Sequence, residues 1–261
     1  YAMALDEGLC TPGTAVADVP ADFAGYRPKN FSLEFEGPVT VRRALVKSLN
    51  IPAIRLARDV GLYRVVDLLR SAGLSTLDQP AEHYGLSLAI GSCEVTLLDL
   101  ANAYACLARG GVRQPVRFLE TEPPGEAVRL FSEESAYMIT DMLGGEERTF
   151  DVAGHVADAV LPRVAWKTGT SNGYRDAWSV AYNPDYVVGV WIGNPDGQPS
   201  EALAGRTAAA PVAYEAFRQI YSGKAPPWFE KPSGLATRPV CARSGAVPQP
   251  FCLVQANDFF I

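Results

Sequence analysis

The chain has 261 residues, a formal net charge of −6 and an isoelectric point of about 5.1, so we expect one large domain or two modest ones. So acidic a chain lacks the basic surface that nucleic-acid binding requires, and no nucleic-acid partner is expected. Hydrophobic residues make up 48% and charged residues 20% of the sequence. This is the balance of a globular protein and excludes a disordered chain.

Neither a membrane span nor a leader is evident. The most apolar stretch, 85–108, is interrupted by Glu94 and Asp99, whereas a spanning helix needs about 20 nearly uncharged apolar residues. The first residues have neither the basic start nor the apolar centre of a signal peptide. Because the chain begins with Tyr1 rather than Met, we expect it to be a piece of a longer protein, with any leader or anchor upstream.

The five cysteines have no metal-binding spacing. Cys93 and Cys106 lie in apolar surroundings and are expected to be buried. Cys241 and Cys252 lie in a segment rich in proline and glycine. They could form a disulfide in an oxidising compartment, or they could be two unpaired thiols.

Helices dominate the first 145 residues. The first 40 are expected to be irregular because prolines interrupt them. Thr40 caps a short helix that stops at 48–50, and Pro52 fits the first turn of the next. Further helices are predicted at 62–72, at 96–109, where the apolar residues have helical spacing, and from Ser132 to 144–145.

Strands follow. Segments 164–168, 177–182 and 186–192 are rich in Val, Tyr and Trp, and 183–185 is predicted to turn the last two into a hairpin. A final helix is predicted at about 208–221. The fold class is therefore α/β of the α+β type, an antiparallel sheet flanked by helices. Residues 1–222 form the expected domain, and the proline-rich residues 223–261 are predicted to be a linker and the start of a C-terminal module.

The strongest local signal is the sequence K-T-G-T at Lys167, Thr168, Gly169 and Thr170, at the end of a predicted strand. A lysine and two threonines in this arrangement can bind a carboxylate through a charge, hydroxyl groups and backbone N–H groups. Gly169 would let another backbone segment approach closely. The alternative is an ordinary strand end followed by turn residues, because so short a motif recurs by chance.

The second signal is Ser48-Leu49-Asn50, between two predicted helices. A hydroxyl and an amide two residues apart on a loop can act on one substrate. The alternative is that Ser48 ends one helix and Asn50 caps the next. Taken alone, the capping interpretation is favoured, because caps are far commoner than active sites.

Together, S-x-N and K-T-G resemble two of the three motifs shared by penicillin-binding proteins and serine β-lactamases. They are 117 residues apart, which suits one domain. The resemblance is closest to the transpeptidase domain of the bifunctional class A penicillin-binding proteins, and Cys241-Ala242-Arg243-Ser244-Gly245 resembles their 1C branch. The segments that carry the similarity, almost continuous as far as Gly223, are 11–30, 39–53, 89–101, 166–178 and 188–193.

The resemblance implies a helix-flanked antiparallel sheet and a serine D,D-transpeptidase that cross-links peptidoglycan stem peptides. It implies that Ser48 relays a proton, that Asn50 and Thr168 bind substrate, and that Lys167 supplies positive potential. The N–H group of Thr170 would be one oxyanion-hole donor, and no metal or organic cofactor is implied. The third motif, S-x-x-K, is absent, since no serine here has a lysine three residues later. Residues 1–8 resemble the end of the helix that carries it, so the nucleophile is expected upstream and this fragment alone is expected to be inactive.

The implied partners are stem peptides ending in D-Ala-D-Ala, with β-lactams as covalent inhibitors of the complete site. A glycosyltransferase domain and a membrane anchor are expected upstream, which implies the periplasmic side of the bacterial inner membrane. A D,D-carboxypeptidase or a β-lactamase would use the same motifs, although a β-lactamase needs a deacylating base, for which Glu94, Glu133 and Glu134 qualify only by residue type. A non-catalytic remnant that binds peptide is the remaining alternative. His83 and His155 are interpreted as structural or surface residues.

Overall fold

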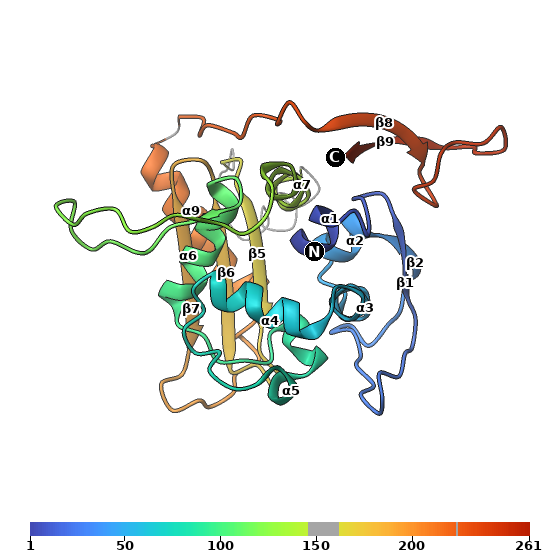
Figure 1. Ribbon diagram of the computed structural model, residues 1–261. Coiled ribbons are helices and arrows are strands. Elements are labelled where there is room, and N and C mark those ends of the chain that lie inside the picture. The colour runs from blue at the N-terminus through green and yellow to red at the C-terminus, as the bar shows by residue number, and fades with distance from the viewer. Residues whose placement is uncertain (146–161, 223) are drawn as a thin grey trace.

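An antiparallel sheet forms the centre of the computed structural model, which describes residues 1–145, 162–222 and 224–261 (Figure 1). Its strands follow the order β5-β6-β7. In the register, Lys167 lies opposite Val180 and Thr170 lies opposite Ala177. A hydrogen bond of 3.0 Å from the N–H of Asn183 to the carbonyl of Tyr186 closes the predicted β6–β7 hairpin. The strands are β5 (Ala165–Thr170), β6 (Asp176–Tyr182) and β7 (Val187–Gly193).

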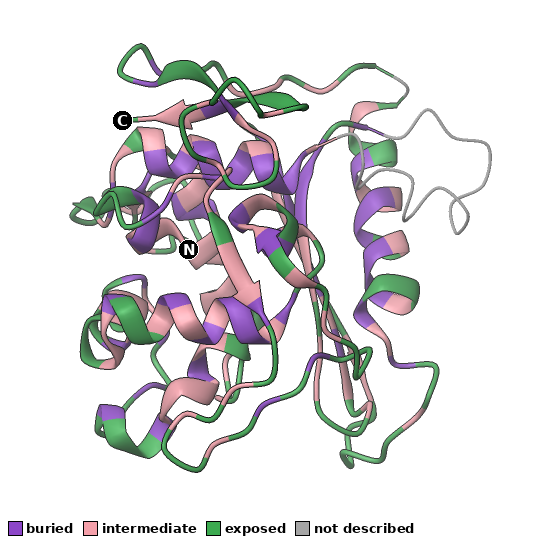
Figure 2. Cartoon of the chain, turned by 90° about the vertical axis from the view of Figure 1, so that its right-hand side faces the viewer, coloured by how far each residue is buried: buried purple, intermediate pink, exposed green. Residues whose placement is uncertain are grey.

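Helices cover both faces of this sheet (Figure 2). On one face, Tyr214 and Phe217 of α9 (Ala210–Tyr221) pack against Trp166. On the other face, α6 (Leu97–Ala108) and α7 (Glu133–Leu143) cover the strands, and Met142 packs near Tyr182. Successive side chains of a strand point to opposite faces of the sheet. The residues of β5 therefore pack alternately in the core on one face and in the core on the other. This arrangement confirms the predicted fold class.

The remaining helices lie beside the sheet and form the second wall of the site described below (Figure 1). Three predicted helix starts are confirmed by side-chain caps: Thr40, Thr96 and Ser132 each accept a hydrogen bond from the backbone N–H three residues later. These helices are α1 (Ala2–Asp6), α2 (Val41–Val46), α3 (Asn50–Val60), α4 (Leu62–Ser71), α5 (Ala81–Tyr84) and the 3₁₀ helix η1 (Leu86–Ile90). The π-helical turn η2 (Gly205–Ala209) instead packs against the sheet and leads into α9.

Two strand pairs in the first half of the chain were not predicted. The expectation that the first 40 residues are irregular is wrong for β1 (Ala15–Asp18) and β2 (Gly37–Thr40), which form an antiparallel pair. Pro38 stands within β2, which is possible because a two-stranded pair has open edges that need no N–H. The other pair is β3 (Val112–Arg113) with β4 (Val128–Arg129).

The segment expected to be a linker contains an antiparallel pair, β8 (Ala236–Cys241) and β9 (Gln255–Phe260). Leu235 and Phe259 pack on the same core as Leu5 of α1, so this part of the segment is in contact with the rest of the fold. The division between 222 and 223 remains a prediction. No helix within the described ranges combines the length and the apolar character needed to cross a bilayer.

Candidate active site

Ser48 stands two residues after the end of α2, in a left-handed backbone conformation with φ of 56°. Two hydrogen bonds fix this turn: the N–H of Ser48 donates to the carbonyl of Leu45 (3.2 Å), and the N–H of Leu49 donates to Ala44 (2.9 Å). Glycine usually occupies this helix-ending position, and a left-handed residue with a Cβ costs about 1–2 kcal/mol. The strain is tolerated here and places an exposed hydroxyl at the end of α2.

Lys167 reaches across from the sheet to this serine. Its Nζ donates hydrogen bonds to Oγ of Ser48 and, at 2.8 Å, to the carbonyl of Thr168. The structure therefore brings together the two motifs that the sequence analysis singled out, although 119 positions separate the two residues. The expectation that Lys167 ends a strand is wrong. It is the third residue of β5, which continues to Thr170 because Gly169 and Thr170 also pair with β6.

Asn50 is the first residue of α3, and the alternative interpretation that it caps this helix is wrong, because Leu49 occupies the N-cap position. The Nδ2 group of Asn50 instead donates to the carbonyl of Lys29 at 2.7 Å. Its backbone N–H donates to Oδ1 of Asn30 at 2.8 Å. These bonds fix the orientation of the amide, so its Oδ1 atom can accept a hydrogen bond from a ligand.

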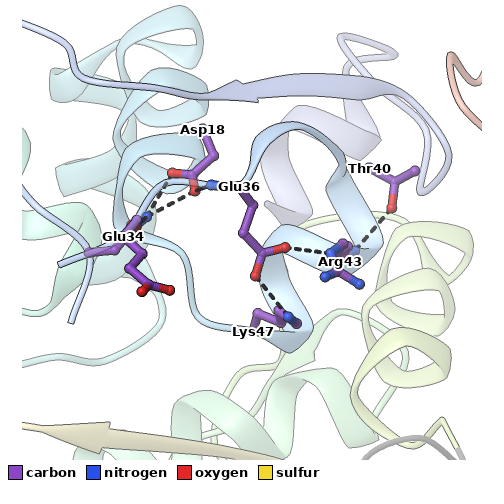
Figure 3. A network of polar contacts seen from close by, with 7 residues as sticks. Asp18, Glu34, Glu36, Thr40, Arg43 and Lys47 are labelled. Carbon is purple, nitrogen blue, oxygen red and sulfur yellow. Dashed lines mark hydrogen bonds and ion pairs between the residues drawn. The ribbon is translucent and has the colours of Figure 1, made fainter. Parts of the chain in front are cut away.

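Behind Asn50 lies a buried polar pair, Asp18 and Asn30, which are 0% and 3% exposed. Nδ2 of Asn30 donates to both carboxylate oxygens of Asp18 at 2.9 Å and to the carbonyl of Glu34 at 2.8 Å. Asp18 also accepts a 2.8 Å hydrogen bond from the backbone N–H of Glu36 (Figure 3). This network connects β1 to the first residue of α3, and so supports the position of Asn50.

Glu36 continues the network to α2, where it pairs with Lys47 and Arg43 (Figure 3). The hydrogen bond from Lys47, followed by that from Arg43, holds the pKa of the Glu36 carboxyl below its usual value. Lys47 immediately precedes Ser48. Its charge is thus engaged on the β2 side, away from the Lys167–Ser48 contact.

The far end of β5 is fixed by Gly205, the first residue of η2. Its N–H donates to Oγ1 of Thr170 at 3.0 Å. A Cβ at Gly205 would overlap the Gly169 carbonyl oxygen and lie 2.6 Å from the Trp178 carbonyl oxygen. The close backbone approach expected at Gly169 is therefore made by Gly205, whereas a Cβ on Gly169 would meet only the Cβ of Trp178, at 3.7 Å.

These two glycines give a paired prediction. Gly205→Ala is expected to lower the free energy of unfolding by about 1–3 kcal/mol, because both carbonyl groups that block the new methyl belong to the rigid sheet. Gly169→Ala is the matched control and should cost less, since that position has room. Urea unfolding of both variants of this chain measures the difference. Equal losses would contradict the packing argument.

An aromatic contact joins the two walls of the site. The ring of Phe31, next to Asn30, packs edge-on against that of Tyr174, with centroids 5.6 Å apart. Tyr174 belongs to the turn that joins β5 and β6. The S-x-N side and the K-T-G side of the site are thus connected at their rim as well as through Lys167 and Ser48.

The other titratable candidates lie elsewhere. His83 is exposed on α5, where its ring contacts Tyr84, so its surface interpretation is confirmed. Glu133 and Glu134 stand in the first turn of α7, where acidic residues favour a helix N-terminus. His155 lies outside the described residues. The Asp18–Asn30 pair was missed as a unit, because a buried polar pair 12 residues apart has no local signature.

Helices cover both faces of the antiparallel sheet, and Lys167 of the edge strand β5 contacts Ser48, two residues before Asn50. The fold resembles that of penicillin-binding protein 1A from Haemophilus influenzae (TM-score 0.81, 21% identity, 100% of this chain and 46% of that one). It also resembles PonA1 from Mycobacterium tuberculosis solved with penicillin V (TM-score 0.72, 22% identity, 95% of this chain and 72% of that one).

Sequence comparison identifies the family. Residues 1–221 match the family model of the penicillin binding protein transpeptidase domain, and the chain belongs to this family. Penicillin-binding protein 1C of Escherichia coli (strain K12) is 36% identical over 249 residues, which cover 94% of this chain and 31% of that protein. Penicillin-binding protein 1A of Neisseria gonorrhoeae is 30% identical over 262 residues, with 91% and 32% covered. The chain spans about a third of the length of these relatives.

Proposed function

We propose that this chain forms the substrate-binding part of a serine D,D-transpeptidase that cross-links peptidoglycan stem peptides. A serine Oγ attacks the carbonyl of the terminal D-Ala-D-Ala bond, and an acyl-enzyme forms as D-Ala leaves with a proton. The amine of a second stem peptide then attacks the acyl-enzyme and forms the cross-link. The observation that carries the proposal is the hydrogen bond between Lys167 and Ser48.

Each site residue has a proposed role. Ser48 relays the proton to the leaving amine, and Lys167 supplies positive potential and orients the Ser48 hydroxyl. Asn50 accepts a hydrogen bond from a substrate amide through Oδ1, since its Nδ2 is engaged by Lys29. Thr168 and Gly169 bind the terminal carboxylate side of the substrate. The N–H of Thr170 is one oxyanion-hole donor.

We also propose that the nucleophile stands upstream of Tyr1. The chain has no S-x-x-K sequence. Ala4 and Leu5 of α1 are fully buried in the main core, as expected for the end of a central helix.

The complete protein is proposed to act on the periplasmic side of the inner membrane, attached by a segment upstream and accompanied by a glycosyltransferase domain. β-Lactams are proposed to acylate the same serine. The names of the relatives and the penicillin V bound to PonA1 support this reading.

The proposal predicts which chain benzylpenicillin can label. This chain is expected to show no covalent adduct by intact mass, whereas the complete protein is expected to gain one acyl group, because only the latter contains the nucleophile. The heat-unfolded complete protein is the control and should remain unlabelled. An adduct on this chain would overturn the upstream nucleophile. An adduct on neither folded protein would overturn the transpeptidase role and favour the non-catalytic remnant.

The neighbouring reactions differ in their products. A transpeptidase transfers the acyl group to an amine, so the complete protein should incorporate a labelled D-amino acid into a D-Ala-D-Ala peptide. A D,D-carboxypeptidase would release D-Ala without incorporation. A β-lactamase would turn over benzylpenicillin instead of retaining the adduct.

A further inference from the structure

Two cysteines meet at the end of the β8–β9 hairpin. Cys241 is the last residue of β8, and Cys252 precedes β9 by three positions. A 3.0 Å hydrogen bond from the N–H of Ala242 to the carbonyl of Val254 joins the two strands at this point. The N–H of Cys252 donates to the carbonyl of Gln249 at 2.8 Å, forming a turn. The connection between the strands therefore folds back and brings the two side chains together.

Polar groups surround the Cys241 thiol in this turn. The Sγ atom of Cys241 interacts with the Ser244 hydroxyl, the Cys252 thiol and the backbone of Arg243 and Ser244. These hydrogen bonds, that of Ser244 first, lower the pKa of the Cys241 thiol to about 6. Cys241 is thus mainly a thiolate at neutral pH, and thiolates are the reactive form of cysteine.

The thiol pKa is raised, not lowered, at the three cysteines outside this hairpin, which are Cys10, Cys93 and Cys106. Burial raises the pKa of both Cys10 and Cys106 to about 11. Burial also raises the pKa of Cys93, which is half-buried rather than buried as expected. A reagent that requires a thiolate should therefore select Cys241 among the five cysteines.

We propose that Cys241 and Cys252 form a reversible intramolecular disulfide by exchange with a disulfide oxidant, either a protein or a small molecule. The Cys241 thiolate attacks one sulfur of the oxidant and expels a thiolate, which leaves a mixed disulfide. The Cys252 thiol then loses its proton and attacks the Cys241 sulfur, expelling the second thiolate. In sum, two thiols lose two protons and two electrons, and the oxidant disulfide is reduced to two thiols.

The bridge would fix the loop 242–251 where that loop contacts the body of the fold. A Cβ on Gly245 would lie 2.6 Å from the Gly13 carbonyl carbon, so the two backbones touch. Asp258 of β9, which is 5% exposed, accepts hydrogen bonds from the Thr11 hydroxyl (2.5 Å) and the Gly13 N–H (2.9 Å). The loop and the strand thus contact the turn 11–14, which joins α1 to β1. Oxidation would tighten the contact between this hairpin and the segment that follows α1.

The test uses this chain in glutathione buffers of increasing oxidised fraction, followed by acid quenching, alkylation under denaturing conditions and peptide mapping. The oxidised chain should lose about 2 Da, with Cys241 and Cys252 in one linked peptide and the other cysteines alkylated. Cys241→Ser and Cys252→Ser should each abolish the linked peptide, whereas Cys93→Ser should leave it unchanged. Full alkylation of both thiols at every ratio, or a link between two chains, would overturn the proposal.

The pH dependence gives a second readout on the reduced, folded chain. A thiol with a lowered pKa is ionised above about pH 6, so iodoacetamide labelling of Cys241 should rise through that pH and level off by about pH 8. Labelling of Cys93 should still be rising above pH 8, because its pKa is raised. A Cys241 rate that keeps rising with that of Cys93 would contradict the thiolate attack.

Discussion

Lys167→Met in the complete protein is expected to slow acylation by benzylpenicillin by about 10²–10³-fold, the usual effect of removing one preorganised electrostatic group from an acyl-transfer site. Lys167 is the residue through which the two walls of the site are hydrogen-bonded, because its Nζ donates to Ser48 and to the Thr168 carbonyl. Methionine keeps much of the length and apolar bulk of the side chain while removing the charge and the donors. Single-turnover acylation, followed by intact mass, measures the rate.

Lys47→Met is the matched control. It removes the same charge one residue before Ser48, but Lys47 pairs with Glu36 at 2.8 Å rather than with a site residue. Exposed ion pairs of this kind contribute little to stability, so the acylation rate should change less than about threefold. Equal losses in the two variants would show that general positive charge, rather than the position of Lys167, governs acylation.

Asn30→Ala is expected to lower the free energy of unfolding of this chain by about 3–5 kcal/mol, because it leaves the fully buried Asp18 carboxylate with fewer donors. The substitution removes hydrogen bonds to both Asp18 oxygens and to the Glu34 carbonyl, as well as the acceptor of the Asn50 N–H. Urea unfolding, monitored by tryptophan fluorescence, measures the loss.

Asn102→Ala is the control for the Asn30→Ala substitution. Its Nδ2 makes one exposed hydrogen bond, to the carbonyl of Gln114 at 2.9 Å. The expected loss is therefore about 0.5–1.5 kcal/mol. Similar losses in the two variants would contradict the expectation that the buried Asp18–Asn30 pair contributes more to stability than an exposed hydrogen bond.

Local signals predicted the elements that the structure confirms. The helix around 96–109 and the strands of the β6–β7 hairpin could be predicted because apolar spacing and turn residues are properties of neighbouring positions. The β1–β2 pair could not, since its strands are short, 18 residues separate their ends, and one of them contains Pro38. Propensity says little about such a pair, whose stability comes from packing and from the polar network around Asp18.

The site, like the fold, could be predicted from the sequence only in part. Ser48, Asn50 and Lys167 could be singled out from two short motifs, and the structure places Ser48 and Lys167 in direct contact. The left-handed backbone at Ser48 could not be predicted, because glycine is the residue expected there. The alternative interpretation of Asn50 as a helix cap is wrong, and its side chain bonds to the carbonyl of Lys29, 21 positions away. Long-range contacts of this kind leave no periodic trace in a sequence.

The contacts that build this site also set when it can form during folding. Ser48 and Lys167 are 119 positions apart. Contacts so distant in sequence require the closure of large loops. The chain loses conformational entropy on closing such a loop before the contacts can stabilise it, so these contacts are associated with slow folding. During synthesis, more than a hundred residues are added after Ser48 and Asn50 before Lys167 is incorporated. The binding groups therefore stay apart until late in synthesis, and the site matures as a product of complete folding rather than as a local unit.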